Sequence, residues 1–268
     1  MPFLDGPACR LWVAVLGAGD PVTIFVHGLS SSSEDLRALA GYVEGTRVLF
    51  DWRGHGRSES PPPEDGYDHA AVVADLDAVA TRYGATQAVG VSMGANALLQ
   101  MLCVDPTRFA RATLIMPSRL DEPCPDPLGS MRFADQIASM PLDQIADNLM
   151  NIAEVQALVT REPRWRAHIR EQLLRINPAG VPHAVRAYAM GEAPVPDPSC
   201  LRKVTTPLFV AGHEKDANHP ASVSRRIGAL APNARVKIWD EDFAMMLDDL
   251  DAFGAMVASF LAGEPVTV

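Results

Sequence analysis

Short apolar runs alternate with stretches of helical periodicity along the first 116 residues and again after residue 207. Runs of four to seven mostly apolar residues are typical of strands buried in a parallel sheet. They predict strands at residues 10–16, 22–26, 47–51, 87–91, 111–116, 208–211 and 235–239. The alternation favours an α/β domain: a mostly parallel central sheet with helices on both faces. The first two strands, joined by the turn at 17–21, are expected to form a hairpin.

The segments between the runs carry the spacing of amphipathic helices. In residues 67–83 the apolar side chains Val72, Leu76 and Val79 recur every three or four positions, as on one helix face. Comparable patterns predict helices at residues 34–42, 93–102, 222–230 and 250–261. These helices are long enough to cover the predicted sheet.

The alternation stops between residues 118 and 200. The pattern there is helical but irregular, because prolines repeatedly interrupt it. They stand at positions 123, 125, 127, 141, 163, 178, 182, 194, 196 and 198. We therefore expect an inserted helical cap at 118–200 and a core formed by 1–117 and 201–268.

Composition narrows the classes of function. The chain has 268 residues, is 48% hydrophobic and has a net charge of −10, which disfavours binding to nucleic acid. A basic leader and a membrane-length apolar run are both missing from the sequence, so a cytoplasmic location without a membrane partner is expected. Its four cysteines are widely scattered and are expected to be reduced thiols. Neither a metal site nor a cofactor is predicted. The cysteines are Cys9, Cys103, Cys124 and Cys200.

One short motif suggests catalysis. Ser92 stands between Gly90 and Gly94, directly after a predicted strand and before a predicted helix. Glycines on both sides permit a tight strand-to-helix turn, and the helix N-terminus places positive dipole ends near the serine. This pattern is typical of a serine nucleophile.

Together with two further segments, this motif resembles the α/β-hydrolase superfamily. Residues 27–29 read H-G-L after a strand, and residues 51–58 read D-W-R-G-H-G-R-S, similar to the D-x-R-G-H-G-x-S segment of the esterase and lyase branches. The resemblance covers almost the whole chain and implies the α/β-hydrolase fold with a helical cap. It also implies an oxyanion hole formed by the backbone N–H groups of Leu29 and Met93.

The resemblance implies an acid after the strand that follows the cap. Asp216 is the first choice and Glu214 the second. The family's histidine base is expected after the last strand, but alignment on Phe243 puts Asp242 at that position. The last histidine in the chain is His219, so this sequence departs from the family pattern there.

The departure leaves the identity of the base open. A carboxylate at Asp242 is a much weaker base than imidazole at neutral pH. His213 is the leading substitute, because it lies on the loop of the presumed acid. His27 and His55 are expected to brace loops, and His219 to cap a turn.

Residues 161–175 contain five arginines and two glutamates, so this segment is positively charged whereas the chain as a whole is negatively charged. Charge runs of this kind are usually solvated helix faces. Alternatively, they form a patch for coenzyme A or a phosphopantetheine-bound acyl group. The candidate patch residues are Arg161, Arg164, Arg166 and Arg170.

These observations predict a serine-dependent acyl-transfer enzyme that acts on an ester or thioester through Ser92. The acceptor is either water, as in an esterase or thioesterase, or a thiol or amine, as in an acyltransferase. Two alternatives remain. One is a hydrolase inactivated at position 242, and the other a non-hydrolytic lyase, cyclase or binding protein on the same fold.

Overall fold

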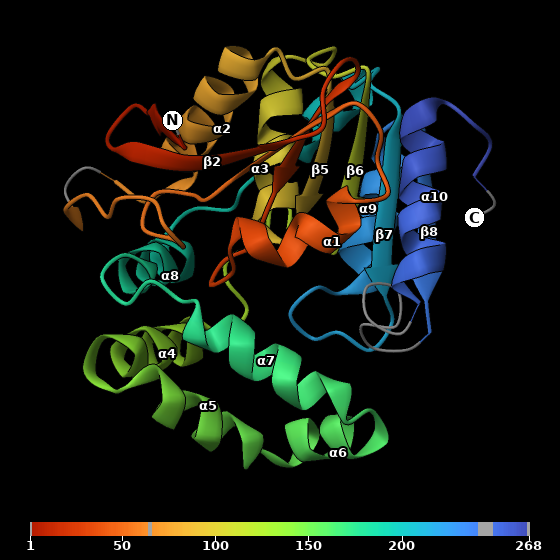
Figure 1. Ribbon diagram of the computed structural model, residues 1–268. Helices are drawn as coiled ribbons and strands as arrows, with labels where there is room; N and C mark the ends of the chain where they lie inside the picture. The colour runs from red at the N-terminus through yellow and green to blue at the C-terminus, as the bar shows by residue number, and fades with distance from the viewer. Residues whose placement is uncertain (1, 64–65, 241–248, 267–268) are drawn as a thin grey trace.

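The computed structural model describes residues 2–63, 66–240 and 249–266. Its centre is an eight-stranded sheet with the strand order β1-β2-β4-β3-β5-β6-β7-β8 (Figure 1). The strands are β1 (Phe3–Asp5), β2 (Arg10–Leu16), β3 (Val22–Val26), β4 (Thr46–Phe50), β5 (Gln87–Val91), β6 (Arg111–Ile115), β7 (Leu208–His213) and β8 (Ala234–Trp239). The predicted strands agree with these within two residues at either end.

The pairing corrects the expected hairpin. Strand β2 runs antiparallel to β4, with Val13 opposite Phe50, and does not pair with β3. Strand β4 lies between them and runs parallel to β3. From β4 to β8 all neighbouring strands are parallel. The hairpin prediction was wrong because an apolar run specifies a strand but not its neighbour, and β3 is buried between two parallel strands.

Alternate residues of each strand face two apolar layers. Ile24 and Val26 of β3 belong to the layer that is covered by α2 (His69–Tyr83), α3 (Met93–Val104) and α9 (Ala221–Leu230). Phe25 faces the other layer, under η1 (Ser33–Leu36), α1 (Arg37–Ala40) and α10 (Leu250–Ala262). The predicted helices on both faces are thus confirmed.

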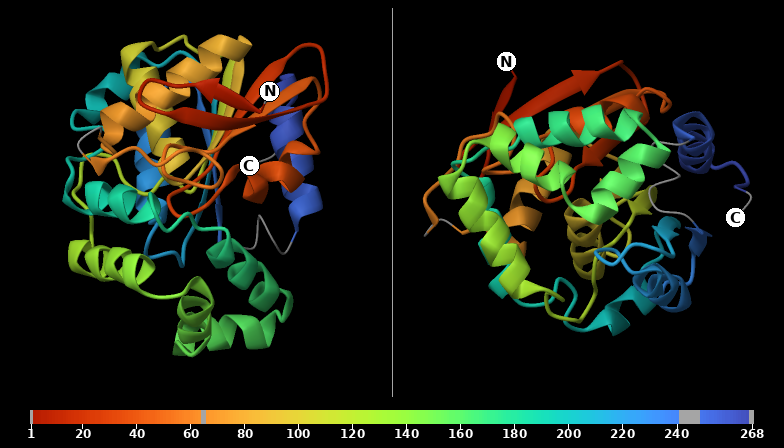
Figure 2. Two further views of the ribbon diagram at one scale, coloured as in Figure 1. Left: turned by 60° about the vertical axis from the view of Figure 1, so that its left-hand side comes forward. Right: turned by 90° about the horizontal axis from the view of Figure 1, so that it is seen from below.

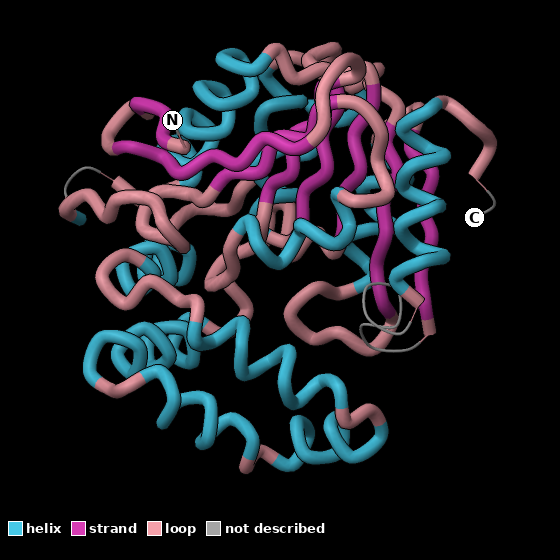
Figure 3. The backbone as a smooth tube through the Cα atoms, in the orientation of Figure 1, coloured by secondary structure: helices cyan, strands magenta, loops and turns pink. Residues whose placement is uncertain are grey.

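The helical insertion is also confirmed. It consists of α4 (Pro127–Ser139), α5 (Leu142–Met150), α6 (Ala153–Arg161), α7 (Arg164–Leu174) and α8 (Val181–Met190), followed by η3 (Pro198–Lys203). Helices α4 to α8 gather beyond the carboxyl ends of the parallel strands, below the sheet in the view of Figure 3 and in the left view of Figure 2. They have small apolar clusters of their own, one of them built around Ile137, Ile145 and Val185.

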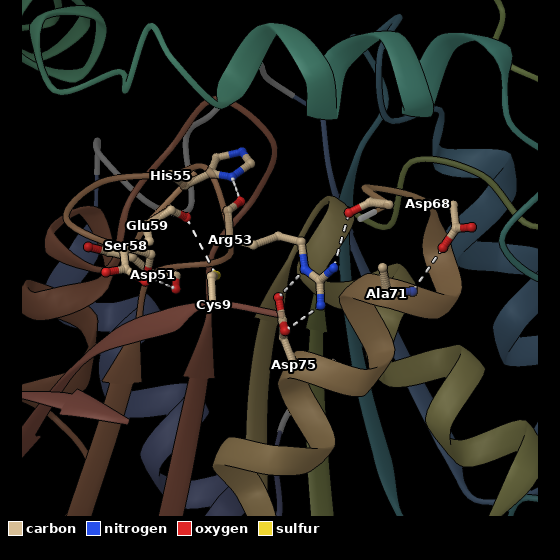
Figure 4. A network of polar contacts seen from close by, with 10 residues as sticks. Cys9, Asp51, Arg53, His55, Ser58, Glu59, Asp68, Ala71 and Asp75 are labelled. Atoms are coloured by element: carbon tan, nitrogen blue, oxygen red, sulfur yellow. Dashed lines mark hydrogen bonds and ion pairs between the residues drawn. The ribbon is translucent and has the colours of Figure 1, made fainter. Parts of the chain in front are cut away.

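A bidentate ion pair is buried beneath the sheet edge. Arg53, in the loop after β4, donates from Nε and Nη2 to the carboxylate of Asp75 on α2, at 2.8 and 2.7 Å (Figure 4). The two side chains are 3% and 0% exposed. In the same loop Asp51 accepts hydrogen bonds from the backbone N–H groups of Ser33 and Arg57. The D-x-R-G-H-G-x-S segment thus anchors neighbouring loops to the core.

The expectation of four reduced thiols is corrected by a disulfide. Cys103 near the end of α3 is bonded to Cys200 in η3, with a Cα–Cα distance of 5.2 Å. A separation of 97 residues leaves no local signal for such a pair. Cys9 and Cys124 are free thiols. Within the described residues, none of the helices has the length and apolar character needed to cross a membrane.

Candidate active site

Ser92 lies at the turn between β5 and α3, with φ 54° and ψ −115°. A positive φ is unfavourable for a serine and costs on the order of 1–3 kcal/mol, which the surrounding structure must offset. Gly90 and Gly94, on either side of Ser92, are required because a larger side chain would not fit at either position. A Cβ atom on Gly94 would lie 2.3 Å from the carbonyl oxygen of Val26, and one on Gly90 would lie 2.7 Å from that of Gly94. Close packing of β3, β5 and α3 therefore holds the serine in this strained turn.

A hydrogen-bonded chain joins Ser92 to a histidine and an aspartate. His219 Nε2 lies 2.9 Å from Ser92 Oγ, and His219 Nδ1 lies 2.7 Å from Asp216 Oδ2. The backbone N–H groups of Asn218 and His219 donate to Asp216 Oδ1 at 2.9 and 3.0 Å. The same carboxylate thus shapes the loop and orients the imidazole toward the serine.

Asp216 remains ionised at neutral pH. Burial acts to raise the pKa of this carboxyl, but the hydrogen bond and the charge of His219, with the two backbone N–H groups, outweigh it. The net pKa therefore lies below the ordinary value for aspartate. An ionised Asp216 stabilises a proton on His219 Nδ1 and leaves Nε2 free to accept the serine hydrogen.

The structure corrects the expectations for two histidines. His219, expected to cap a turn, instead points its ring at Ser92. His213, the predicted substitute base, ends β7, is fully buried beside Trp239 and is not among the residues lining the cavity at Ser92. Pro220 forms an isolated bridge with His213, so the loop of 214–219 returns to the strand end and delivers His219 to the sheet edge.

The sequence did contain a signal for this arrangement. His219 lies three residues after Asp216, in the loop between a strand and a proline that precedes a helix. An acid and a base on one such loop reach the same strand end. Asp242, the predicted occupant of the histidine position, lies outside the described residues. Glu214 forms an ion pair with Arg225. Within the described part of the chain, it makes no contact with Ser92 or His219.

His27 and His55 occupy buried positions behind the loops. The Nε2 atom of His27 accepts from the backbone N–H of Trp52 at 3.2 Å, and the Trp52 indole donates to the His27 carbonyl at 2.8 Å. Burial lowers the pKa of His27, and burial next to His27 lowers that of His55 to about 3. Both rings therefore stay neutral and hold the loops in place.

The loop after β3 lies directly against the serine. A Cβ atom on Gly28 would lie 3.2 Å from the Ser92 Cβ, a tight contact that a larger residue could make only if the loop or the serine shifted. Leu29 follows it and lines the same cavity, whereas Met93 is the first residue of α3. The first N–H groups of a helix have no partner within the helix and point outward from its end. Leu29, next to Gly28, and Met93, the chain neighbour of Ser92, thus both lie close to the serine.

A cavity of about 410 Å³ opens over Ser92 and His219. The core supplies Gly28, Val91 and Met116, and the cap supplies Phe133 and Tyr188. A second cavity of about 400 Å³ shares Gly28, Val91 and Met116 with the first and extends under α7. A substrate bound here contacts both the sheet edge and the cap.

The predicted arginine patch is separate from these cavities. Arg161, Arg164 and Arg166 are exposed, and none of the four patch residues lines either cavity. Arg164 forms an ion pair with Glu162, and Arg170 with Asp147. The patch is therefore a solvated helix surface with some of its charges already paired.

Comparisons with known proteins agree with the fold. Residues 23–251 match the model of the alpha/beta hydrolase family. The fold is similar to an enol-lactonase from Burkholderia xenovorans, with a TM-score of 0.80, 18% identity, and coverage of 97% of this chain and 100% of that one. It is also similar to a thermophilic esterase from Thermogutta terrifontis, with a TM-score of 0.79, 19% identity, and coverage of 97% and 98%.

A third similar structure is MenH from S. aureus, with a TM-score of 0.78, 18% identity, and coverage of 94% of this chain and 98% of that one. No curated protein matches the chain significantly in sequence. At these identities the solved structures establish the fold and leave the reaction open. The family match, however, extends over most of the chain. It includes the strand-to-helix turn at Ser92, which we call the Ser92 elbow, and the loop of Asp216 and His219. The chain therefore belongs to the alpha/beta hydrolase family.

Proposed function

We propose that this protein is a serine hydrolase of carboxylic esters, with Ser92 as nucleophile, His219 as general base and Asp216 as the group that orients His219. The observation that carries the proposal is the unbroken chain from Asp216 Oδ2 through both imidazole nitrogens to Ser92 Oγ. A serine hydroxyl needs such a base to attack an ester carbonyl.

In the first half of the reaction, Ser92 Oγ attacks the carbonyl carbon while its proton moves to His219 Nε2. The carbonyl oxygen becomes an oxyanion, which we assign to the backbone N–H groups of Leu29 and Met93. Fixed donors at such a position are worth about 3–4 kcal/mol each in comparable enzymes. The C–O bond to the alcohol then breaks, and the alcohol leaves with the proton from His219, so that an acyl-serine remains.

In the second half, His219 removes a proton from water, and the hydroxide attacks the acyl-serine. The carboxylic acid leaves and the proton returns to Ser92. A base in contact with Ser92 supports water as the acceptor and removes the reason to favour a thiol or amine. The surface position of the arginine patch likewise gives no support to a coenzyme A thioester as the substrate.

The first test uses variants of the two candidate bases. We expect His219→Ala to lower kcat/KM for a short-chain 4-nitrophenyl ester by about 10⁴-fold or more. Asp242→Ala should retain most of the activity if His219 is the base. The opposite result, an active His219→Ala and an inactive Asp242→Ala, would restore the base predicted from the family alignment.

A second measurement tests the nucleophile without a substrate. Intact mass after treatment with a fluorophosphonate should rise by one phosphonyl group, and Ser92→Ala should show no addition. An unmodified Ser92 with a correctly folded protein would reject the hydrolase proposal and favour a lyase, cyclase or binding protein. Because the label reports serine reactivity alone, its result does not depend on the choice of ester.

A further inference from the structure

One wall of the cavity at Ser92 carries a cluster of polar side chains that the proposed reaction does not use. Asn96 on α3 is fully buried, and its Nδ2 donates to Ser118 Oγ at 2.7 Å. The Ser118 N–H donates back to Asn96 Oδ1 at 3.3 Å. Tyr188 on α8 places its hydroxyl 3.3 Å from Ser118 Oγ. Ser118 and Tyr188 both line the cavity that contains Ser92.

Counting hydrogens shows what this pair offers to a ligand. The two hydroxyls of Ser118 and Tyr188 have two hydrogens, and their mutual hydrogen bond uses one of them. The Asn96 amide donates to the Ser118 hydroxyl, and its oxygen accepts from the Ser118 backbone N–H and not from that hydroxyl. No other acceptor for either hydroxyl is found among the described residues. Whichever hydroxyl donates within the pair, one O–H group remains available to a molecule in the cavity.

A buried arginine stands behind this wall. Arg119 is 2% exposed, donates from Nη2 to the Tyr188 carbonyl at 2.8 Å, and lies with its guanidinium 4.0 Å from the centre of the Tyr188 ring. Its Nε and Nη1 atoms have no hydrogen-bond partner within the described part of the chain. An unpaired buried cation is costly, and it favours negative charge nearby.

Among the described residues, no carboxylate forms an ion pair with Arg119, and the Asp68 carboxylate near His69 caps the start of α2. His69 Nε2 lies 3.4 Å from Arg119 Nη2, but burial and the charge of Arg119 lower the pKa of His69 to about 4, so the ring is neutral at pH 7. Asp126 lines the cavity, but it is exposed and caps α4 by accepting from the Gly129 N–H. The polar wall therefore combines an available hydroxyl donor with a nearby positive charge.

We propose that Ser118 and Tyr188 form a subsite that donates a hydrogen bond to a second oxygen of the substrate, away from the scissile ester. Arg119 fixes Tyr188 and adds a positive charge, so a carboxylate is the preferred acceptor over a neutral carbonyl oxygen. The substrate class is thus an ester whose acyl or alcohol part bears a carboxylate. This inference rests on the proposed ester hydrolysis for its kinetic test, but not for its binding test.

The kinetic test compares esters that differ only in the second oxygen group. On the acyl side, monoethyl glutarate is compared with ethyl pentanoate and with the neutral ketone ethyl 5-oxohexanoate. On the alcohol side, 4-acetoxybutanoate is compared with butyl acetate. Acid release is followed by titration at constant pH. We expect at least one carboxylate ester to exceed its apolar partner in kcat/KM by about 10- to 100-fold, as a hydrogen bond to a charged group predicts.

Variants assign the preference to the proposed groups. The Ser118→Ala, Tyr188→Phe double variant removes both hydroxyls and should reduce the ratio of kcat/KM between the preferred carboxylate ester and its apolar partner by about 10-fold or more. Ser130→Ala is the matched control, because Ser130 lines the same cavity but already donates to the Asp126 carbonyl. Ser130→Ala should change kcat/KM for both esters by the same factor. Arg119→Met should lower the preference for glutarate over the ketone. Each ratio is independent of the folded fraction of a preparation.

Two results would overturn the proposal: equal kcat/KM for the partners in both pairs, or an unchanged ratio in the Ser118→Ala, Tyr188→Phe double variant. A ketone ester that matches the glutarate ester would overturn the role of Arg119. Calorimetric binding of monoethyl glutarate and ethyl pentanoate to Ser92→Ala tests the subsite without turnover. Failure of the hydrolase proposal leaves this difference in affinity intact, whereas failure of the subsite abolishes the difference and leaves fluorophosphonate labelling of the unmodified protein intact.

Discussion

The core and the cap of this protein are each stabilised by different kinds of contact. The core packs a sheet between two large apolar layers and adds a fully buried ion pair, Arg53 with Asp75. The cap has two small apolar clusters, and ion pairs such as Arg170 with Asp147 and Arg186 with Asp135 lie at its surface. Burial makes contacts in the core costly to break, whereas solvent screens those in the cap.

The same division separates reactivity from substrate choice. Ser92, Asp216 and His219 all come from core loops at the carboxyl ends of parallel strands. The cap contributes Phe133 and Tyr188 to the cavity wall. Substitutions of these three core residues are therefore expected to change activity toward every substrate. Substitutions in the cap should alter which substrate is preferred.

The largest expected effect concerns the acid in the core. Asp216→Asn keeps an oxygen for the backbone N–H groups of Asn218 and His219 but loses the negative charge that orients the imidazole. We expect a decrease in kcat of about 10⁴-fold, measured with an activated ester, and a nearly unchanged fold by circular dichroism.

Glu214→Gln is the control for this prediction. Glu214 was the second choice for the acid, but the structure pairs it with Arg225 at the surface. Its activity should remain close to that of the unmodified protein. A strong loss in Glu214→Gln with little change in Asp216→Asn would exchange the two assignments.

A smaller effect, on stability, is expected at the buried ion pair of the core. Arg53→Met leaves Asp75 buried without its partner, which should lower the free energy of unfolding by about 3–5 kcal/mol. Urea unfolding measures the change. The exposed pair of Arg10 and Glu59 serves as the control, and Arg10→Met should leave the urea midpoint unchanged. Equal losses in both variants would contradict the contrast between buried and exposed pairs.

The disulfide should stabilise the attachment of η3, the segment that follows the cap helices, to α3 of the core. The Cys103→Ser, Cys200→Ser double variant is expected to lose about 2–4 kcal/mol of stability, since the bond closes a long loop in the unfolded chain. Reduction of the unmodified protein should lower the urea midpoint in the same direction. A midpoint that is insensitive to reduction would show that the bond contributes nothing to stability.

The smallest effect is expected within the cap. Arg186→Met removes the pair with Asp135, whose side chain is 68% exposed. Such pairs contribute about 0–1 kcal/mol, so the urea midpoint should shift little. A loss comparable to that of Arg53→Met would mean that the cap is stabilised as the core is.

How far the sequence predicts this molecule depends on whether a feature is local. The Ser92 elbow was located because glycines, strand and helix all fall within a few residues. The pairing of β2 with β4 and the bond between Cys103 and Cys200 were missed, since both join segments distant in sequence. The role of His219 was not predicted, because alignment with the family places the base after the last strand. In the folded protein, any loop at the same edge of the sheet can bring a histidine to Ser92.

The bond between Cys103 and Cys200 also changes the topology of the chain. Residues 103–200 form a closed covalent ring that contains all of α4 to α8. A protease that cuts once within the cap therefore produces two polypeptides that stay linked until a reductant is added. Any opening of the cap over Ser92 must occur with both ends of this ring tied to α3, the helix that begins at the nucleophile.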